Sequence, residues 1–170
     1  MALVNGTFDV SVPKNATRGG WTTSRIDILG GWSGGGNPGQ FFILNNNGRG
    51  PAAPTIAQVV TGFAPGSMYR IEGDYRVVHL GQGTKDFGVL VDSAPILELF
   101  PPSLDARAWS PFSVDFTATS ESHTIAFAGE RFFDTDFGVD NLTVAEVPEP
   151  ATLGLLVIGG LTLLRHKRHR

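Results

Sequence analysis

The chain has 170 residues, which is enough for one ordinary domain and a tail. It contains no cysteine, so disulfide bonds and thiolate metal sites are excluded. Four of the 13 basic residues lie in the last six positions; without them 9 basic residues stand against 16 acidic ones, a net charge of −7. An acidic body excludes nucleic acid as the expected partner, because phosphate neutralisation needs clustered lysine and arginine.

The body is predicted to consist of short strands. The chain has 22 glycines and 11 prolines, which suit turns, and polar and apolar residues of the body alternate with a period of two in several segments. The alternation is longest in residues 68–80, where Arg70, Glu72, Asp74 and Arg76 share one face. The nine expected strands are residues 3–12, 40–44, 55–61, 68–80, 87–92, 95–100, 111–119, 123–129 and 141–147.

Two glycine- and proline-rich segments separate some of these strands. Residues 30–40 and 45–55 are expected to be long turn-rich connections, which carry function in many all-β domains or act as plain connectors. About eight to nine short strands with such connections are typical of a β-sandwich or barrel. We expect this all-β domain to cover residues 3–146.

The chain changes character after residue 146. The prolines of the sequence VPEP cannot donate ladder hydrogen bonds, and an apolar run from residue 151 to residue 164 follows. As a helix this run would be about 21 Å long, which is short for a typical membrane span of about 20 residues. A basic end after an apolar helix predicts a cytoplasmic C-terminus and a body on the outer side. The alternative is a helix that packs in the domain core.

The ending resembles the PEP-CTERM sorting signal. Pro148, Glu149 and Pro150, a short apolar segment with Gly159 and Gly160, and an arginine-rich terminus occur in the order of that signal. The resemblance implies that residues 147–170 form a sorting segment, which exosortase, a membrane-embedded protease of Gram-negative bacteria, cuts near Pro-Glu-Pro. It implies a transient stay in the inner membrane through residues 151–164, then release to the cell surface or extracellular matrix. A permanent single-pass anchor is the alternative.

Substrates of that class carry an N-terminal signal peptide. Residues 1–10 have neither a basic region nor an apolar core and lead directly into an expected strand. Export therefore requires a signal that was removed or that is encoded upstream of Met1.

The body is similar to jelly-roll domains of the galactose-binding and carbohydrate-binding-module type. The resemblance rests on residues 3–9, 55–77, 112–129 and 137–144, in that order. It implies a jelly-roll β-sandwich, and in many relatives a structural Ca²⁺ where the first strand meets the last. The matching positions are Asp9 and Asp140, whose carboxylates suit a cation that prefers oxygen ligands. The alternative is a pair of turn-forming aspartates at strand edges.

A second acidic group lies at residues 132–141. Asp134, Asp136 and Asp140 could bind a cation, but their spacing is not that of an EF-hand loop. We expect this stretch to be a solvated acidic loop instead.

Three tryptophans are candidates for sugar binding. Trp21, Trp32 and Trp109 lie in or beside loops, and aromatic rings commonly serve as platforms for ligands with apolar faces. A tryptophan in a sandwich also commonly fills the core. The polar face of residues 70–76 is either one wall of a groove or a solvated face of alternating charges.

The sequence contains none of the common catalytic motifs that a hydrolase would show. Of the two histidines in the body, His123 is expected at a strand edge, and a Ser-His-Asp arrangement assembled by the fold stays open. The sequence predicts a non-catalytic surface protein that binds extracellular polysaccharide, and the resemblance to PEP-CTERM proteins implies an association with exopolysaccharide and biofilm. The alternatives are a structural matrix protein without a glycan site and a polysaccharide hydrolase.

Overall fold

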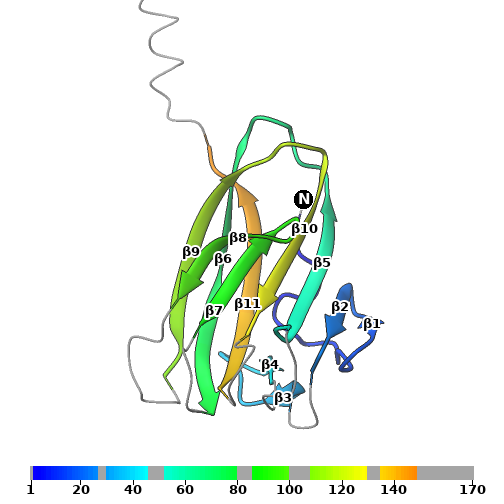
Figure 1. The fold of residues 1–170 in the computed structure, drawn as a ribbon, viewed down its shortest axis with the longest axis vertical. Coiled ribbons are helices and arrows are strands. Elements are labelled where there is room, and N and C mark those ends of the chain that lie inside the picture. The colour runs from blue at the N-terminus through cyan, green and yellow to red at the C-terminus, as the bar shows by residue number, and fades with distance from the viewer. Residues whose placement is uncertain are drawn as a thin grey trace, which may run out of the picture.

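The computed structural model describes residues 2–26, 30–45, 52–79, 86–99, 108–129 and 135–148. Within these ranges the protein is all-β, with two antiparallel sheets and no helix. Figure 1 shows the strands running along the long axis of the molecule, with the shortest ones gathered near one end. The predicted jelly-roll-like β-sandwich is therefore confirmed.

The two sheets contain six and five strands. The six-stranded sheet has the order β1-β2-β5-β10-β7-β8. Its strands are β1 Thr17–Arg18, β2 Trp21–Ser24, β5 Thr55–Thr61, β7 Phe87–Val91, β8 Ala94–Leu99 and β10 Ser122–Ala128. The five-stranded sheet has the order β3-β4-β11-β6-β9. Its strands are β3 Gly31–Gly34, β4 Gln40–Leu44, β6 Met68–His79, β9 Ser110–Thr117 and β11 Asp136–Glu146.

One hydrophobic core lies between the sheets. Because successive side chains of a strand point to opposite faces, the longer strands such as β5, β6 and β10 contribute every second residue to it. Rings dominate its centre: Phe87 stacks on Tyr75 at a centroid distance of 5.2 Å and on Phe127 at 6.4 Å. Strand β6 shows the predicted alternation, with residues 69, 71, 73, 75 and 77 buried and the charged residues between them on the outer face.

The prediction of a strand at residues 3–12 is wrong. Residues 4–7 form a turn, and Asn5 and Phe8 have φ angles of +55° and +53°. The Asn5 side chain stabilises the turn, since its Oδ1 accepts from the backbone of Val10 and its Nδ2 donates to the Val10 carbonyl. Phe8 is fully buried, so the segment still contributes to the core without pairing in a sheet.

Strands β1, β2 and β3 were not expected. The last of them occupies part of the segment predicted as a connection at residues 30–40, and it pairs with β4 so that Trp32 lies opposite Phe42. These strands have two to four residues, too few for a period of two to be recognised.

Strand β11 leads directly into the sorting signal. Glu146 is its last residue and pairs with Tyr69, and the backbone N–H of Val147 donates to the Met68 carbonyl at 2.9 Å. The predicted helix at residues 151–164 and the motif residues Glu149 and Pro150 lie outside the described residues. None of the described residues belongs to a helix long and apolar enough to cross a membrane.

Candidate functional site

The outer face of the five-stranded sheet presents its side chains in rows across the central strands β9, β6 and β11. Asp74 of β6 lies opposite Asp140 of β11 and Pro111 of β9. Two residues earlier in β6, Glu72 lies opposite Thr143 and Ser113. The polar face predicted at residues 70–76 is therefore real, and neighbouring strands complete it.

These two rows form an open groove of about 560 Å³. Strand β6 supplies carboxylates, β9 a hydroxyl and an apolar floor, and β11 an amide and a second hydroxyl. The groove is lined by Glu72, Gly73, Asp74, Pro111, Phe112, Ser113, Asn141 and Thr143. A shallow groove that combines hydrogen-bonding groups with apolar residues can hold a polar ligand along its length. A flat charged face cannot do so.

An aromatic and cationic cluster borders the groove one row further along β6, at Arg76. The Arg76 guanidinium carbon lies 4.3 Å from the centroid of the Phe41 ring and 4.6 Å from that of Trp109. The two rings meet edge to face at 5.5 Å. Burial lowers the pKa of Arg76 from its ordinary value, although Asp140 opposes that shift. The guanidinium is thus desolvated between rings, a geometry that strengthens cation–π attraction.

Gly138 makes room for this cluster. A Cβ on Gly138 would lie 2.7 Å from the Phe41 ring, closer than real Cβ contacts. Glycine within a strand commonly marks such a close approach. The Phe41 ring therefore lies against the backbone of β11, with Arg76 stacked above it.

An ion pair borders the groove on the opposite side. Arg70 Nε and Nη2 donate to the two carboxylate oxygens of Asp115 at 2.7 and 2.9 Å. This two-point geometry raises the pKa of Arg70 and lowers that of Asp115. Both side chains are partly exposed, so the pair fixes their orientation more than it stabilises the fold.

A polar network connects the groove to the loop between β3 and β4. Asp140 is fully buried; its Oδ2 accepts from the Asn37 backbone at 2.6 Å and its Oδ1 from the Asn141 backbone at 2.8 Å. The Asn141 side chain donates to Asp74 Oδ2 at 2.8 Å, and Asn37 Nδ2 donates to the same oxygen at 3.2 Å. The loop is thereby attached to the floor of the site.

The predicted calcium ligands lie close enough to interact. Burial is the main reason that the pKa of Asp140 is raised, and the negative charges of Asp74 and Asp9 raise it further, against the two backbone hydrogen bonds. Asp9 is exposed and accepts from the Thr7 hydroxyl at 2.7 Å. Within the described ranges no three acidic, histidine or cysteine side chains form a group that could hold a metal ion.

The three tryptophans occupy three different environments. Trp21 is fully buried, with its ring stacked on Phe8 at 5.8 Å and its indole N–H donated to the Asn5 carbonyl. Its predicted role as a sugar platform is therefore wrong, because the core between the sheets contains the whole ring. Trp109 contacts Arg76 on the outer face of the five-stranded sheet.

Trp32 lies on the other face of that sheet from Trp109. Its partner across β4 is the core residue Phe42, and residues directly opposite in a sheet point to the same side. The ring stays 41% exposed at the edge strand, and its indole N–H donates to the Phe8 carbonyl at 2.7 Å. The two tryptophans thus do not form one platform.

The predicted solvated acidic loop is wrong for Asp136 and Asp140, which belong to β11 and are buried. Asp136 begins the strand, and its Oδ1 accepts from the Asn45 side chain. Asp134 lies outside the described residues.

A Ser-His-Asp arrangement does occur, at the end of the sandwich near Glu121. His123 Nδ1 lies 2.5 Å from Asp92 Oδ2, and Ser120 Oγ lies 3.5 Å from His123 Nε2. The backbone N–H groups of Thr119 and Ser120 both donate to Nε2, and the serine hydroxyl donates to the Ser122 carbonyl at 2.6 Å. Nε2 is therefore not directed as a base at the hydroxyl, which a nucleophilic serine would require.

Sequence reasoning did not find the residues of β9 and β11 that line the groove. Ser113, Asn141 and Thr143 are ordinary polar positions of alternating strands, and only the pairing register places them beside Glu72 and Asp74. Gly138 was a usable signal, since a glycine inside a strand pattern indicates close packing. Asn141 also has a φ of +53°, which its sequence context does not predict.

The C-terminal segment matches a known sorting motif. Residues 146–168 match the PEP-CTERM protein-sorting motif. This PEP-CTERM match confirms the resemblance of the ending and implies an exported protein, held through its C-terminus before processing. No curated protein has a sequence that matches this chain.

The sandwich is similar to solved carbohydrate-binding modules. A family 4 module is 15% identical with a TM-score of 0.57, covering 85% of this chain and 99% of that one. The second family 16 module is 18% identical, with the same TM-score and coverage. A cyclase from Fischerella sp. TAU, in complex with 4-(1H-indol-3-yl)butan-2-one, is 13% identical with a TM-score of 0.58, covering 83% and 99%. At these identities the likeness establishes the fold alone.

Proposed function

We propose that the protein is an exported surface protein that binds extracellular polysaccharide without chemical change, through the groove on the outer face of the five-stranded sheet. The groove carries this proposal: carboxylate, amide and hydroxyl groups from three strands line one trough together with the apolar residues Pro111 and Phe112. Sugars present hydroxyls and apolar ring faces, which such a lining can recognise together. The similarity to carbohydrate-binding modules supports the same assignment.

Trp109 extends the proposed site beyond the groove. Its ring is half-buried beside Arg76 and lies next to β9, whose Pro111 and Ser113 line the trough. Trp32 keeps an exposed edge on the other side of the sheet and would serve a separate contact. Of the predicted tryptophans, Trp109 is therefore the first candidate platform.

A steric block tests the groove directly. Thr143→Trp places a large side chain in the trough from an exposed position of β11, and Thr61→Trp places the same group on the exposed face of β5 in the other sheet. We expect the host's extracellular polysaccharide to bind the wild-type protein and Thr61→Trp alike, and Thr143→Trp at least about tenfold more weakly. Equal binding by all three proteins would place the contact elsewhere, and no binding to any of them would refute polysaccharide recognition.

We also propose that exosortase processes the tail and releases the protein from the inner membrane of a Gram-negative bacterium to the surface or biofilm matrix. The motif match supports this, as does the end of β11 at Glu146, two residues before Pro148. Intact mass of surface-released protein should place the mature C-terminus between Val147 and Pro150. Recovery of protein ending at Arg170 from a host with exosortase would contradict the proposal.

Calcium at Asp9 and Asp140 is a further proposal. Each Asp140 oxygen accepts one backbone N–H and retains a lone pair, and Asp9 and Asp74 add negative charge nearby. A hard cation would offset this like-charge repulsion and the burial of Asp140, using the carboxylates of Asp9 and Asp140 as ligands.

A structural matrix role without a glycan site is the alternative function. It predicts retention in the matrix that does not change when the groove is blocked. The Thr143→Trp protein therefore distinguishes the two functions in the same experiment.

A further inference from the structure

The charges around the groove are strongly unequal. Two carboxylates, those of Glu72 and Asp74, lie in its lining, and none of its described lining residues is cationic. Glu72 is exposed, and the hydrogen bond that it accepts comes from the neutral Ser113 hydroxyl at 3.3 Å. Asp74 accepts from the neutral amides of Asn37 and Asn141. These hydrogen bonds orient the carboxylates without bringing a positive charge to them.

The two arginines that border the groove supply less positive charge than the carboxylates around it require. Arg70 makes both of its hydrogen bonds to Asp115 and also interacts electrostatically with Glu72. Arg76 lies between the rings of Phe41 and Trp109 and interacts with the buried Asp140. Two guanidinium groups thus stand against the carboxylates of Glu72, Asp74, Asp115 and Asp140, so negative charge stays in excess around the groove.

We propose that the groove selects polysaccharides by charge, favouring chains with free amino groups over neutral chains and rejecting chains of uronic acids. This inference rests on the proposed glycan-binding function and specifies its ligand. A protonated amine can pair with Glu72 or Asp74 and donate hydrogen bonds to it, which a neutral hydroxyl does without the charge term. A uronate carboxylate would meet like charges on the same wall, which costs binding free energy.

The test compares three soluble hexasaccharides at mildly acidic pH and low ionic strength: a β-linked glucosamine hexasaccharide, its fully N-acetylated counterpart and a polygalacturonate hexasaccharide. At this pH the amines are protonated, whereas exposed carboxylates are still ionised. We expect the wild-type protein to bind the glucosamine chain most tightly and the uronate chain least. The preference should shrink in high salt, since exposed charges are screened.

Glu72→Gln isolates the charge. The new amide keeps an oxygen that can accept from Ser113, so the wall retains its shape. Affinity for the glucosamine chain should fall by about two- to fivefold, the range for one exposed ion pair, and affinity for the N-acetylated chain should fall by less. Glu98→Gln, which removes an exposed carboxylate from β8 of the other sheet, is the control and should change neither.

The outcomes separate the two proposals. Tightest binding of the uronate chain, or a glucosamine affinity that Glu72→Gln does not change, would overturn the charge selection while leaving glycan binding in place. Failure of all three chains and of the host polysaccharide would overturn both. Tightest binding of the amino chain with loss in Glu72→Gln alone would support the inference.

Discussion

The His123 Nδ1 donates to Asp92 Oδ2 and so joins β10 to the turn between β7 and β8. Nε2 accepts from the backbone of Thr119 and Ser120, which identifies Nδ1 as the nitrogen that carries the hydrogen. Asp92 Oδ1 in turn accepts from the Thr124 backbone at 2.8 Å. One buried imidazole therefore holds two turns at the same end of the sandwich.

Loss of this imidazole should destabilise the fold. In His123→Ala two backbone N–H groups lose their acceptor, and the edge-to-face contact with Phe63 at 5.1 Å is removed. We expect the free energy of unfolding to fall by about 2–4 kcal/mol, measured by urea titration. Ser120→Ala removes an exposed hydroxyl from the same turn and should cost under about 1 kcal/mol. An equal cost for both variants would show that the imidazole is not the stabilising group.

The loss of folding stability at acidic pH should depend on Asp92. Its pKa is lowered, mainly by the Thr124 backbone hydrogen bond and further by His123, against the effect of burial. A lowered folded-state pKa contributes stability that is complete above the unfolded value of about 3.9 and disappears as pH falls through the folded value. At neutral pH the Tm of the wild type should exceed that of Asp92→Asn by up to about 4 °C. The difference is no larger because the Asp92 side chain is half exposed to solvent.

Thermal scans from neutral pH to below pH about 3 measure this difference. The gap between wild type and Asp92→Asn should narrow only below about pH 4. A gap that stays constant to the acid end would contradict the assignment.

Gly138→Ala should disturb the cluster of Phe41, Arg76 and Trp109. The new Cβ would lie 2.7 Å from the Phe41 ring, which must move and lose contact with the guanidinium. We expect a loss of about 1–3 kcal/mol in chemical denaturation, together with a change in tryptophan fluorescence. Gly34→Ala is the matched control, because its Cβ would meet only Gln40 Oε1 at 3.6 Å. A Gly138→Ala protein as stable as this control would show that the cluster adapts freely.

Trp21 should behave as a core residue. Trp21→Ala removes a fully buried ring and should cost about 3–5 kcal/mol, whereas Trp21→Phe should cost less because a ring can still pack on Phe8. Urea unfolding measures both. Trp21→Phe protein that remains folded should bind polysaccharide like wild type. Loss of binding in a fully folded Trp21→Phe protein would contradict the placement of Trp21 in the core alone.

Calcium should stabilise the protein if Asp9 and Asp140 hold it. At a free concentration of 100 times its Kd, a ligand that binds only the folded state adds about 2.7 kcal/mol. Asp9 is exposed, so Asp9→Asn should fold normally and lose most of the increase in Tm that calcium causes, with Glu98→Gln as the control. An identical calcium response in wild type and Asp9→Asn, or no response in either, would exclude Asp9 as a ligand.

The sequence predicted those parts of the fold that depend on local alternation. The outward positions of Arg70, Glu72, Asp74 and Arg76 follow from the period of two in β6. The turn at residues 4–7 was missed because the positive φ angles of Asn5 and Phe8 interrupt a pattern that looks like a strand. Asparagine tolerates that conformation well, but phenylalanine rarely adopts it.

The site itself depends on contacts between distant residues. Asn37 donates to Asp140, 103 residues away, and Arg76 stacks between rings that come from β4 and from the residue before β9. No local pattern encodes such pairings, because they follow from the register of the strands. The same limit explains Trp21 and Trp109: both lie beside glycine- or proline-containing turns, yet one is in the core and the other contacts a surface arginine.

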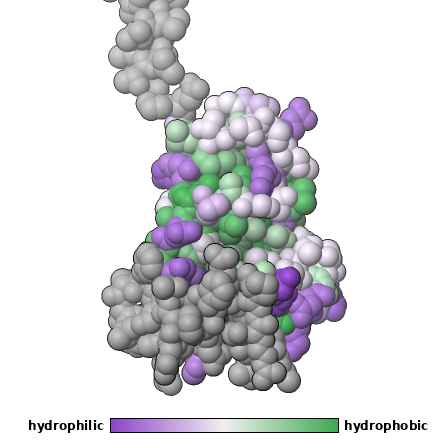
Figure 2. Space-filling model, in the orientation of Figure 1, coloured by the Kyte–Doolittle hydropathy of each residue, from purple (hydrophilic) through white to green (hydrophobic). Residues whose placement is uncertain are grey.

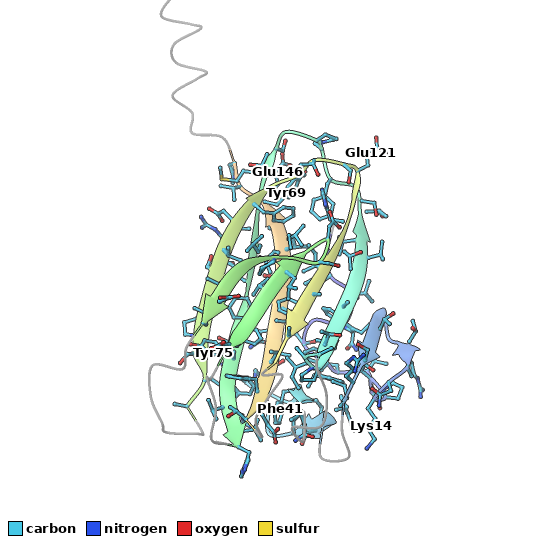
Figure 3. The ribbon with its side chains drawn as sticks, in the orientation of Figure 1. Lys14, Phe41, Tyr69, Tyr75, Glu121 and Glu146 are labelled. Atoms are coloured by element: carbon cyan, nitrogen blue, oxygen red, sulfur yellow. The ribbon has the colours of Figure 1, made fainter. Side chains whose placement is uncertain are left out.

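The hydrogen bond from Val147 to Met68 has a consequence for how the protein is displayed. Only three peptide units separate Pro148 from residue 151, a reach of at most about 11 Å. A chain still held through residues 151–164 would keep the end with Tyr69, Glu121 and Glu146 next to the bilayer and turn the end with Phe41 and Lys14 toward the surroundings (Figure 3). On the face that Figure 2 shows, apolar residues lie among hydrophilic ones. Cutting the tail would free the sandwich to rotate. It could then turn any of its sides toward its surroundings, instead of always the same end.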